Sequence, residues 1–161
     1  MELHGIIEFV YKHKQRKPGS GSVDHLHAVK DILKKAGVTD PAILNAALLH
    51  DVLEDTQMPK EYLTLKFGPR IADLVWVLSK NNPDEVAKSP EAILIRMADQ
   101  LHNLQTIHGL AKEKRQEYLK ETNDVLLPML KRAMKKIPVG EVRTCGTRLL
   151  RKLEKIIDGE R

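Results

Sequence analysis

The sequence predicts an all-α fold, and three observations support this prediction. Apolar residues recur at intervals of three and four along nearly all of the 161 residues, which is the spacing that gives a helix one apolar face. No stretch alternates polar and apolar residues for long enough to indicate a strand. Proline, glycine and capping residues divide the chain at points typical of helix ends. We expect one domain over residues 1–161, because this length is typical of a single domain.

The first two helices are expected at about 3–14 and 24–36. The loop between them, at 18–22, reads PGSGS and combines a helix-ending proline with flexible residues. Asp24 is the expected N-cap of the second helix, since a short acidic side chain can accept from the free backbone N–H groups there. Gly37 is expected to end this helix as a left-handed cap.

A third helix is expected to begin after Asp40, because this capping residue precedes a proline in the first turn. The pattern predicts that the helix runs to about Thr56. Shorter helices are expected at about 59–66 and 69–80, separated by a Gly-Pro pair. The segment 81–83, which reads NNP, is the loop that follows them.

Ser89 and the proline after it repeat the cap-then-proline signal. They are expected to begin a long helix that runs to about Ile107. Two C-terminal helices are expected at about 111–136 and 139–158, with Pro138 between them. These last helices contain no motif to which the sequence assigns a role.

The composition favours a small polyanionic ligand over other classes of partner. The 27 Lys and Arg residues outnumber the 22 Asp and Glu residues, which gives a formal charge of +5. One Trp, three Tyr and two Phe are too few for a platform on which single-stranded nucleic acid stacks. The basic C-terminal helices carry no nucleic-acid-binding motif, so nucleic acid is not an expected partner. The sequence does not indicate an oligomeric state.

The hydropathy pattern indicates where in the cell the protein is located, and the cysteine count indicates which kind of metal site it can have. No apolar run reaches the roughly 18 residues of a membrane span, and the start lacks a secretion signal, so a cytoplasmic protein with no membrane partner is expected. The single Cys145 cannot form an internal disulfide or a zinc site with other cysteines. Any metal is therefore expected on histidine and carboxylate ligands.

Ionisable residues gather where the third predicted helix ends. Residues 42–49 are apolar almost all round, and His50, Asp51, Glu54 and Asp55 follow at once. The helical repeat places residues four apart one turn from each other, so an imidazole and three carboxylates share one helix end. Carboxylates this close repel one another unless a cation is present, and this donor set suits a divalent transition metal. A solvated acidic helix end is the alternative, but the helix dipole disfavours it.

Two further candidates lie elsewhere in the sequence. Asp99 interrupts an apolar helix and lies one turn before Asn103, although a carboxylate in such a place is often the ion-pair partner of an Arg or Lys. His25 and His27 lie near the start of the second helix, about 200° apart around it, so only one can face the core. For a lone histidine, packing or capping is the usual role.

Together these segments resemble a known family. The order of His25, His50-Asp51 and Asp99 is that of the HD superfamily of metal-dependent phosphohydrolases. A closer resemblance is to the hydrolase domain of RelA/SpoT-type stringent-response enzymes and their small stand-alone relatives. It rests on four segments, which are 25–33 (HLHAVKDIL), 46–56 (AALLHDVLEDT), 67–75 (FGPRIADLV) and 93–104 (ILIRMADQLHNL). The motif-bearing core covers about 9–108. The remaining residues of the 161 leave no room for the synthetase domain of the long enzymes.

The resemblance implies a helical bundle that hydrolyses a nucleotide with one divalent ion of the Mn²⁺ type. The implied ligands of this ion are His25, His50, Asp51 and Asp99. Glu54 and Asp55 match the acidic pair beside the attacking water, and Asn103 matches a position that faces the nucleotide. The implied substrate is guanosine 3′,5′-bispyrophosphate, which would yield GDP and pyrophosphate.

The segment before His25 departs from the family pattern. It is about two residues shorter than usual, and Ser22 stands where the family has a tyrosine. The basic residues Lys14, Arg16 and Lys17 precede Ser22. They are expected to contact the substrate phosphates, and a solvated basic face is the alternative. Loss of the tyrosine predicts weaker base stacking.

Two other functions also agree with these residues. A general HD-type nucleotidase or phosphatase would keep the same ligands but release inorganic phosphate, for example from NADPH or a nucleoside monophosphate. A nucleotide-binding module without catalysis is the other alternative. The presence of both Glu54 and Asp55 argues against it, because a binding protein has no need of carboxylates that orient water.

Overall fold

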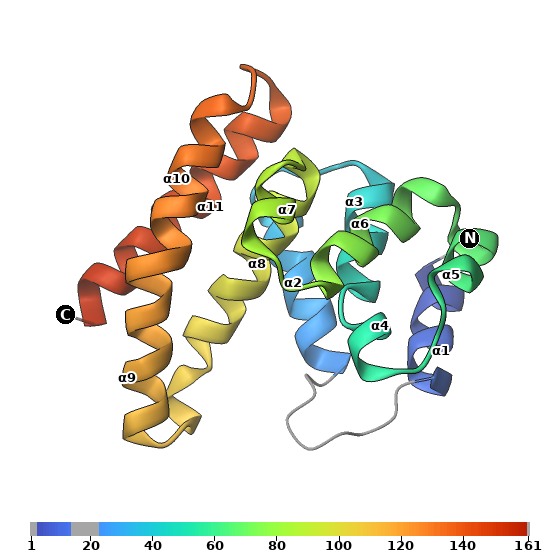
Figure 1. Cartoon of the computed structure of the whole chain (residues 1–161), viewed down its shortest axis with the longest axis horizontal. Coiled ribbons are helices and arrows are strands. Elements are labelled where there is room, and N and C mark those ends of the chain that lie inside the picture. Colours follow the sequence, from blue (N-terminus) through green and yellow to red (C-terminus); the bar gives the residue numbers. More distant parts are fainter. Residues whose placement is uncertain (1–2, 14–22, 161) are drawn as a thin grey trace.

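The computed structural model describes residues 3–13 and 23–160, and its regular elements in these ranges are all helical, which confirms the all-α prediction (Figure 1). In chain order the α-helices are α1 (Leu3–His13), α2 (Val23–Lys35), α3 (Pro41–Leu49), α4 (Val52–Asp55), α5 (Lys60–Phe67), α6 (Pro69–Ser79), α7 (Pro83–Ala87), α8 (Pro90–Gln105), α9 (Lys112–Glu121), α10 (Leu127–Lys136) and α11 (Glu141–Glu160). A short 3₁₀ turn follows α8 at Ile107–Gly109.

Helix α8 is the centre of the fold. In Figure 1 it lies between a group that includes α1 and α3 to α6 on one side and the C-terminal helices α9 to α11 on the other. It packs against α2, α3, α6, α10 and α11. Residues 92–95, 97 and 98 are buried, so α8 is apolar nearly all round and both groups of helices cover it. Gln100 is buried and Asp99 only partly exposed on this helix, so polar groups of α8 reach the interior.

Several predicted helix ends are confirmed. The Asp40 side chain accepts from the backbone N–H of Ala42, and Ser89 accepts from Ala92, as N-caps do. Gly37 has a φ of 102°, the left-handed conformation expected of a cap after α2. The Asp24 prediction was wrong, because α2 begins at Val23 and Asp24 lies inside its first turn.

The third helix ends seven residues before the predicted end at Thr56. Helix α3 stops at Leu49, His50 and Asp51 form a turn, and α4 begins at Val52. The break has an electrostatic reason. It moves Glu54 and Asp55 from the C-terminal end of one helix to the first turn of another, where the helix dipole favours negative charge.

Two more differences from the prediction follow from local side chains. Helix α7 was missed, and it begins because the Asn82 side chain accepts from the N–H groups of Asp84 and Glu85. The helix expected at 111–136 is interrupted by a π-helical segment, Thr122–Leu126. Pro128 has no N–H to donate to the preceding turn, and the wider turn before it accommodates this loss.

The C-terminal helices are part of the same core. Helix α11 packs on both α10 and α8, with Leu149 and Leu153 fully buried. At Gly146 the helices approach so closely that a Cβ atom would lie 2.7 Å from the Met134 side chain and 3.3 Å from that of Leu94. Helix α11 therefore packs closely against α10 and α8, and the single domain stays a prediction.

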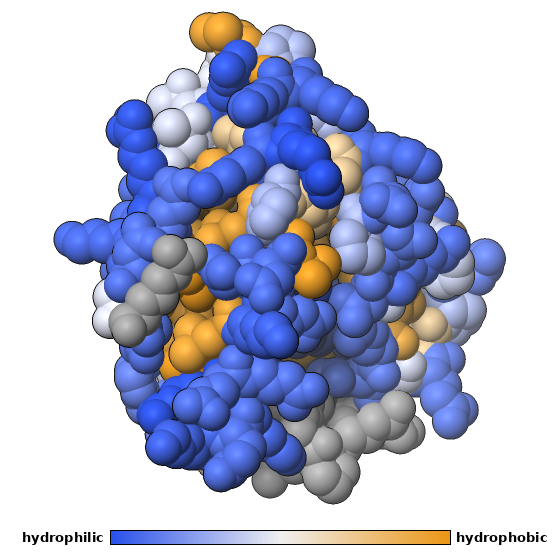
Figure 2. All heavy atoms as spheres, turned by 60° about the vertical axis from the view of Figure 1, so that its left-hand side comes forward, coloured by the Kyte–Doolittle hydropathy of each residue, from blue (hydrophilic) through white to orange (hydrophobic). Residues whose placement is uncertain are grey.

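The face of the molecule in Figure 2 is mostly polar and charged, with hydrophobic side chains visible between the polar ones and at the upper edge. Among the described residues, no helix combines the length and the apolar character needed to cross a membrane.

We expect Leu149→Ala to lower the free energy of unfolding by about 2–5 kcal/mol, because it leaves a cavity between α11 and α8. Urea denaturation followed by circular dichroism measures this change. Leu65→Ala is the matched control, since Leu65 is 83% exposed and its removal leaves no cavity. Equal, small changes for the two variants would show that α11 lies outside the cooperative unit.

Candidate metal centre

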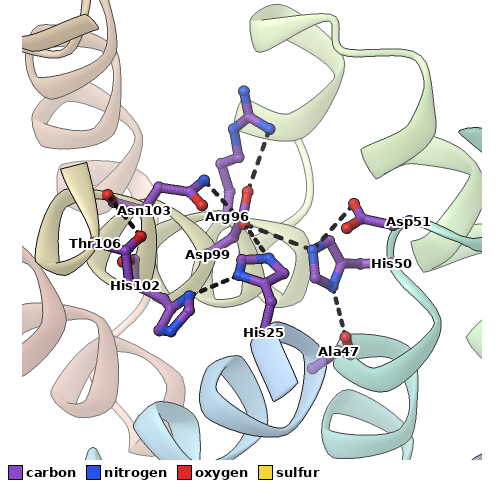
Figure 3. A network of polar contacts seen from close by, with 9 residues as sticks. All are labelled: His25, Ala47, His50, Asp51, Arg96, Asp99, His102, Asn103 and Thr106. Carbon is purple, nitrogen blue, oxygen red and sulfur yellow. Dashed lines mark hydrogen bonds and ion pairs between the residues drawn. The ribbon is translucent and has the colours of Figure 1, made fainter. Parts of the chain in front are cut away.

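Three residues that are far apart in the sequence meet at one point beside α8. His25 comes from α2, His50 from the turn after α3 and Asp99 from the middle of α8, as Figure 3 shows. One donor atom from each lies within 4.8 Å of the others. His25 and His50 are buried. Of the two histidines at the start of α2, His25 is thus the one that faces this cluster.

The distances place two imidazoles around one carboxylate oxygen. Nε2 of His25 is 3.0 Å from Oδ1 of Asp99, and Nε2 of His50 is 3.6 Å from the same oxygen. Oδ1 of Asp51 lies 3.1 Å from Nε2 of His50. Asp51 is therefore beside the cluster, although the compact group of three donors does not include it.

The second nitrogen of each imidazole is held in place. Nδ1 of His50 donates to the backbone oxygen of Ala47 over 2.6 Å. Nδ1 of His25 lies 2.7 Å from Nδ1 of His102, so one of these nitrogens donates to the other. Such contacts orient the rings of metal-binding histidines, and here they turn both Nε2 atoms toward the Asp99 carboxylate. His102 was not among the predicted site residues, and only its position one turn after Asp99 could have indicated it.

The charges of the cluster fit a bound cation. Nε2 of His50 is buried and has no hydrogen-bond partner in the described part of the chain, although it faces Asp51 and Asp99. Burial lowers the pKa of His50, but Asp99 and Asp51 outweigh this effect and raise it to about 9. Burial raises the pKa of Asp99, but the neighbouring imidazoles of His25 and His50 outweigh this effect and lower it. Positive charge is therefore favoured at the point where these groups meet.

The acidic pair of α4 lies next to this cluster. Glu54 and Asp55 both line the pocket that contains His25, His50 and Asp99. Partial burial and the charge of Asp51 raise the pKa of Glu54 at the exposed rim of this pocket. A carboxylate in this place can act on a water molecule bound in the pocket, since a raised pKa makes it a better proton acceptor.

The pocket above the cluster has a volume of about 430 Å³. Asn103 lines it, and its Nδ2 donates to Oδ1 of Asp99 over 3.2 Å, so the amide also holds the central carboxylate. Burial and Asp99 raise the pKa of the Tyr118 phenol, another lining group, to about 12. Tyr118 therefore stays protonated over a wide pH range and can donate a hydrogen bond.

The far wall of the pocket was not predicted. It consists of Tyr118, Glu121, Thr122, Val125 and Leu126, which come from α9 and the π-helical segment. Buried Gln100 of α8 donates to the Thr122 hydroxyl over 2.7 Å, and this hydroxyl donates to the backbone oxygen of Tyr118. No motif marks these residues, and helix α9 has no buried residue that would indicate its place.

The basic residues Lys14, Arg16 and Lys17, together with Ser22, lie outside the described residues. Their predicted contacts with phosphate stay predictions.

Comparison with known proteins agrees with the motifs. Residues 6–91 match the family described as HD domain. The chain is 32% identical over 143 residues to a GTP pyrophosphokinase of Streptomyces coelicolor, covering 79% of this chain and 17% of that protein. It is 31% identical over 148 residues to a guanosine-3′,5′-bis(diphosphate) 3′-pyrophosphohydrolase of Aquifex aeolicus, covering 81% of this chain and 21% of that protein. The chain thus spans about a fifth of the length of these curated relatives.

A solved structure is similar over nearly the whole chain. It is described as a metazoan ortholog of SpoT that hydrolyzes ppGpp and plays a role in starvation responses. The TM-score is 0.72 at 28% sequence identity, and the match covers 98% of this chain and 94% of that one. These matches confirm the resemblance to RelA/SpoT-type proteins, and because more than half of the chain matches one family, the protein belongs to the HD-domain family.

Proposed function

We propose that this protein is a metal-dependent phosphohydrolase that removes pyrophosphate from the 3′ position of guanosine 3′,5′-bispyrophosphate. The observation that carries the proposal is the meeting of His25, His50 and Asp99 beneath a pocket of about 430 Å³. The relatives named for this reaction support the choice of substrate. The remaining chemistry follows from the residues around the cluster.

The proposed ligands of one divalent ion are His25, His50, Asp51 and Asp99. Two imidazole nitrogens and carboxylate oxygens suit Mn²⁺ or a similar divalent ion. The orientation of His50 by Ala47, and the buried Nε2 that faces two carboxylates, support this assignment. When bound, the ion supplies positive charge that polarises a phosphoryl oxygen and lowers the pKa of water.

The acidic pair has the proposed role of preparing the attacking water. Glu54 or Asp55 orients the water and accepts its proton as the oxygen attacks phosphorus. The bond between that phosphorus and the 3′ oxygen of the ribose breaks, and pyrophosphate leaves with the water oxygen attached. The proton returns to the nucleotide's 3′ oxygen, so atoms and charge balance.

Four residues are assigned to contacts with the substrate. Asn103 is proposed to face the nucleotide, which its place in the pocket lining supports. Lys14, Arg16 and Lys17 are proposed to bind phosphate through charge-assisted hydrogen bonds, on the strength of their charge and their place before His25 in the sequence. A cytoplasmic location stays a prediction.

The deciding experiment identifies both products. We expect the purified protein with Mn²⁺ to convert guanosine 3′,5′-bispyrophosphate to GDP and pyrophosphate, separated by ion-exchange chromatography. NADPH and nucleoside monophosphates serve as comparison substrates in the same assay. Release of inorganic phosphate from these compounds, with the guanosine compound left intact, would replace the proposal by the general nucleotidase alternative.

Asp99→Ala tests the metal site without reference to a substrate. We expect Mn²⁺ to raise the melting temperature of the wild-type protein, since a ligand at 100 times its Kd stabilises by about 2.7 kcal/mol. The variant should lose this rise, because Asp99 is the carboxylate that both histidines face. Asp31→Ala, which removes an exposed carboxylate of α2, should keep the full rise. A full rise in Asp99→Ala would contradict the ligand assignment.

Glu54→Gln separates metal binding from catalysis. The variant should keep the Mn²⁺-induced rise in melting temperature but lose about 10²-fold in kcat, the usual scale for a removed general base. Glu113→Gln, an exposed position on α9, is the matched control and should keep wild-type turnover. Wild-type kcat in Glu54→Gln would move the role of base to Asp55, and loss of the metal-induced rise would make Glu54 part of the metal site.

A further inference from the structure

The charges that line the pocket are unbalanced for a site that binds a polyanion. Five carboxylates line it, from Asp51, Glu54, Asp55, Asp99 and Glu121. Among the described lining residues, Arg96 is the only lysine or arginine. A phosphate group entering the pocket would meet strong repulsion unless cations oppose these carboxylates. Among the described lining residues, Arg96 is therefore the side chain whose charge suits a phosphate group.

Arg96 lies on the side of Asp99 opposite the histidines. In Figure 3 its side chain rises from α8 above the Asp99 carboxylate, while His25 and His50 approach from below and from the side. Nη1 of Arg96 is 3.8 Å from Oδ2 of Asp99, too long for a hydrogen bond. The ion pair with Asp99 thus leaves the donors of Nη1 available to another acceptor.

The Arg96 guanidinium is also held by a residue that lies just after the end of α6. Nη2 of Arg96 donates to Oδ1 of Asn81 over 3.0 Å. Asn81 follows α6 and has a φ of 49°, and in the described part of the chain it is the one residue other than glycine with positive φ. Asparagine tolerates this conformation better than most residues. The backbone there would suit glycine equally, so the amide side chain is what Asn81 adds.

A purely structural role does not account for this arrangement. Arg96 is about one-third exposed, with 31% of its side chain accessible, so it can contact a ligand in the pocket. Its positive charge also lies close enough to Glu54 to oppose the rise in the pKa of Glu54 that burial and Asp51 cause. A guanidinium has five donors, and its planar fork matches the oxygens of a phosphate group.

We propose that Arg96 binds the phosphoryl group under attack at the metal centre, and that Asn81 positions its guanidinium for this contact. This inference rests on the proposed function. It adds a residue of α8 that binds a phosphate group of the proposed substrate. Arg96 is the binding residue, and Asn81 is a positioning residue that acts through it. The assignment adds a cation to the pocket that does not depend on the segment before His25.

The test compares phosphate binding and turnover in three variants. Inorganic phosphate is titrated into the Mn²⁺-loaded protein by calorimetry, and KM and kcat are measured for guanosine 3′,5′-bispyrophosphate. Arg96→Gln should raise the Kd for phosphate and the KM by about 10- to 100-fold, the scale of a hydrogen bond to a charged group. Arg96→Lys should restore part of this loss, because it keeps the charge but not the fork.

Asn81→Gly tests positioning without disturbing the backbone. Glycine adopts a φ of 49° readily, so the melting temperature should stay near that of the wild type. The Kd for phosphate should rise, by less than in Arg96→Gln, and the dependence of KM on salt should be kept because Arg96 is still charged. Arg96→Gln should weaken that salt dependence. A merely structural Asn81 would change the melting temperature and leave KM unaltered.

An exposed arginine outside the pocket lining serves as the matched control. Arg151→Gln removes the same charge from an exposed position of α11 and should leave the Kd, KM and kcat unchanged. Wild-type Kd and KM in Arg96→Gln would overturn the assignment of Arg96, even if pyrophosphate is released. If phosphate binding depends on Arg96 while the guanosine compound stays intact, the proposed function fails and the phosphate site stands.

Discussion

The structure depends on one carboxylate of its central helix, that of Asp99, whose side chain is only 13% exposed. Asp99 lies on α8, whose neighbours at 92–95, 97 and 98 are all buried, so its charge cannot be left to solvent. Two imidazoles and an amide meet it, from His25, His50 and Asn103. The packing of α2 and α3 on α8 delivers the two histidines. Compensation of this charge and construction of the site are thus the same requirement.

The break between α3 and α4 is the second consequence of crowded charge. A continuous helix would hold four ionisable groups at its C-terminal end, against the helix dipole. The turn at His50 and Asp51 instead lets Nδ1 of His50 donate to Ala47 and turns Nε2 toward Asp99. It also begins a new helix, in which Glu54 and Asp55 occupy the first turn. The local cost of ending α3 is offset by favourable positions for these two acidic residues.

The sequence predicted the features that spacing, capping residues or motifs mark, and it missed those that carry no such signal. Apolar spacing predicted the helical class, and the Asp40 and Ser89 caps are where proline and hydrogen-bonding side chains require them. The meeting of His25, His50 and Asp99 was predicted because the order of these residues in the sequence resembles that of a known family. The places of Tyr118 and Thr122 were not, because the contact from Gln100 spans 22 residues and has no periodic signal. The helix break at His50 was missed because apolar spacing carries no information on dipole energies.

The far wall of the pocket shows how an unmarked segment can take part in a site. Pro128 in the first turn of α10 has no backbone N–H to donate, and the turn before it widens into the π-helical segment. The Thr122 hydroxyl at the start of this segment binds Gln100 on one side and the backbone of Tyr118 on the other. The same α8 that carries Asp99 thereby fixes the wall that faces it. Because both walls are attached to one helix, the distance across the pocket is set by the packing of α8 and not by the loops between helices.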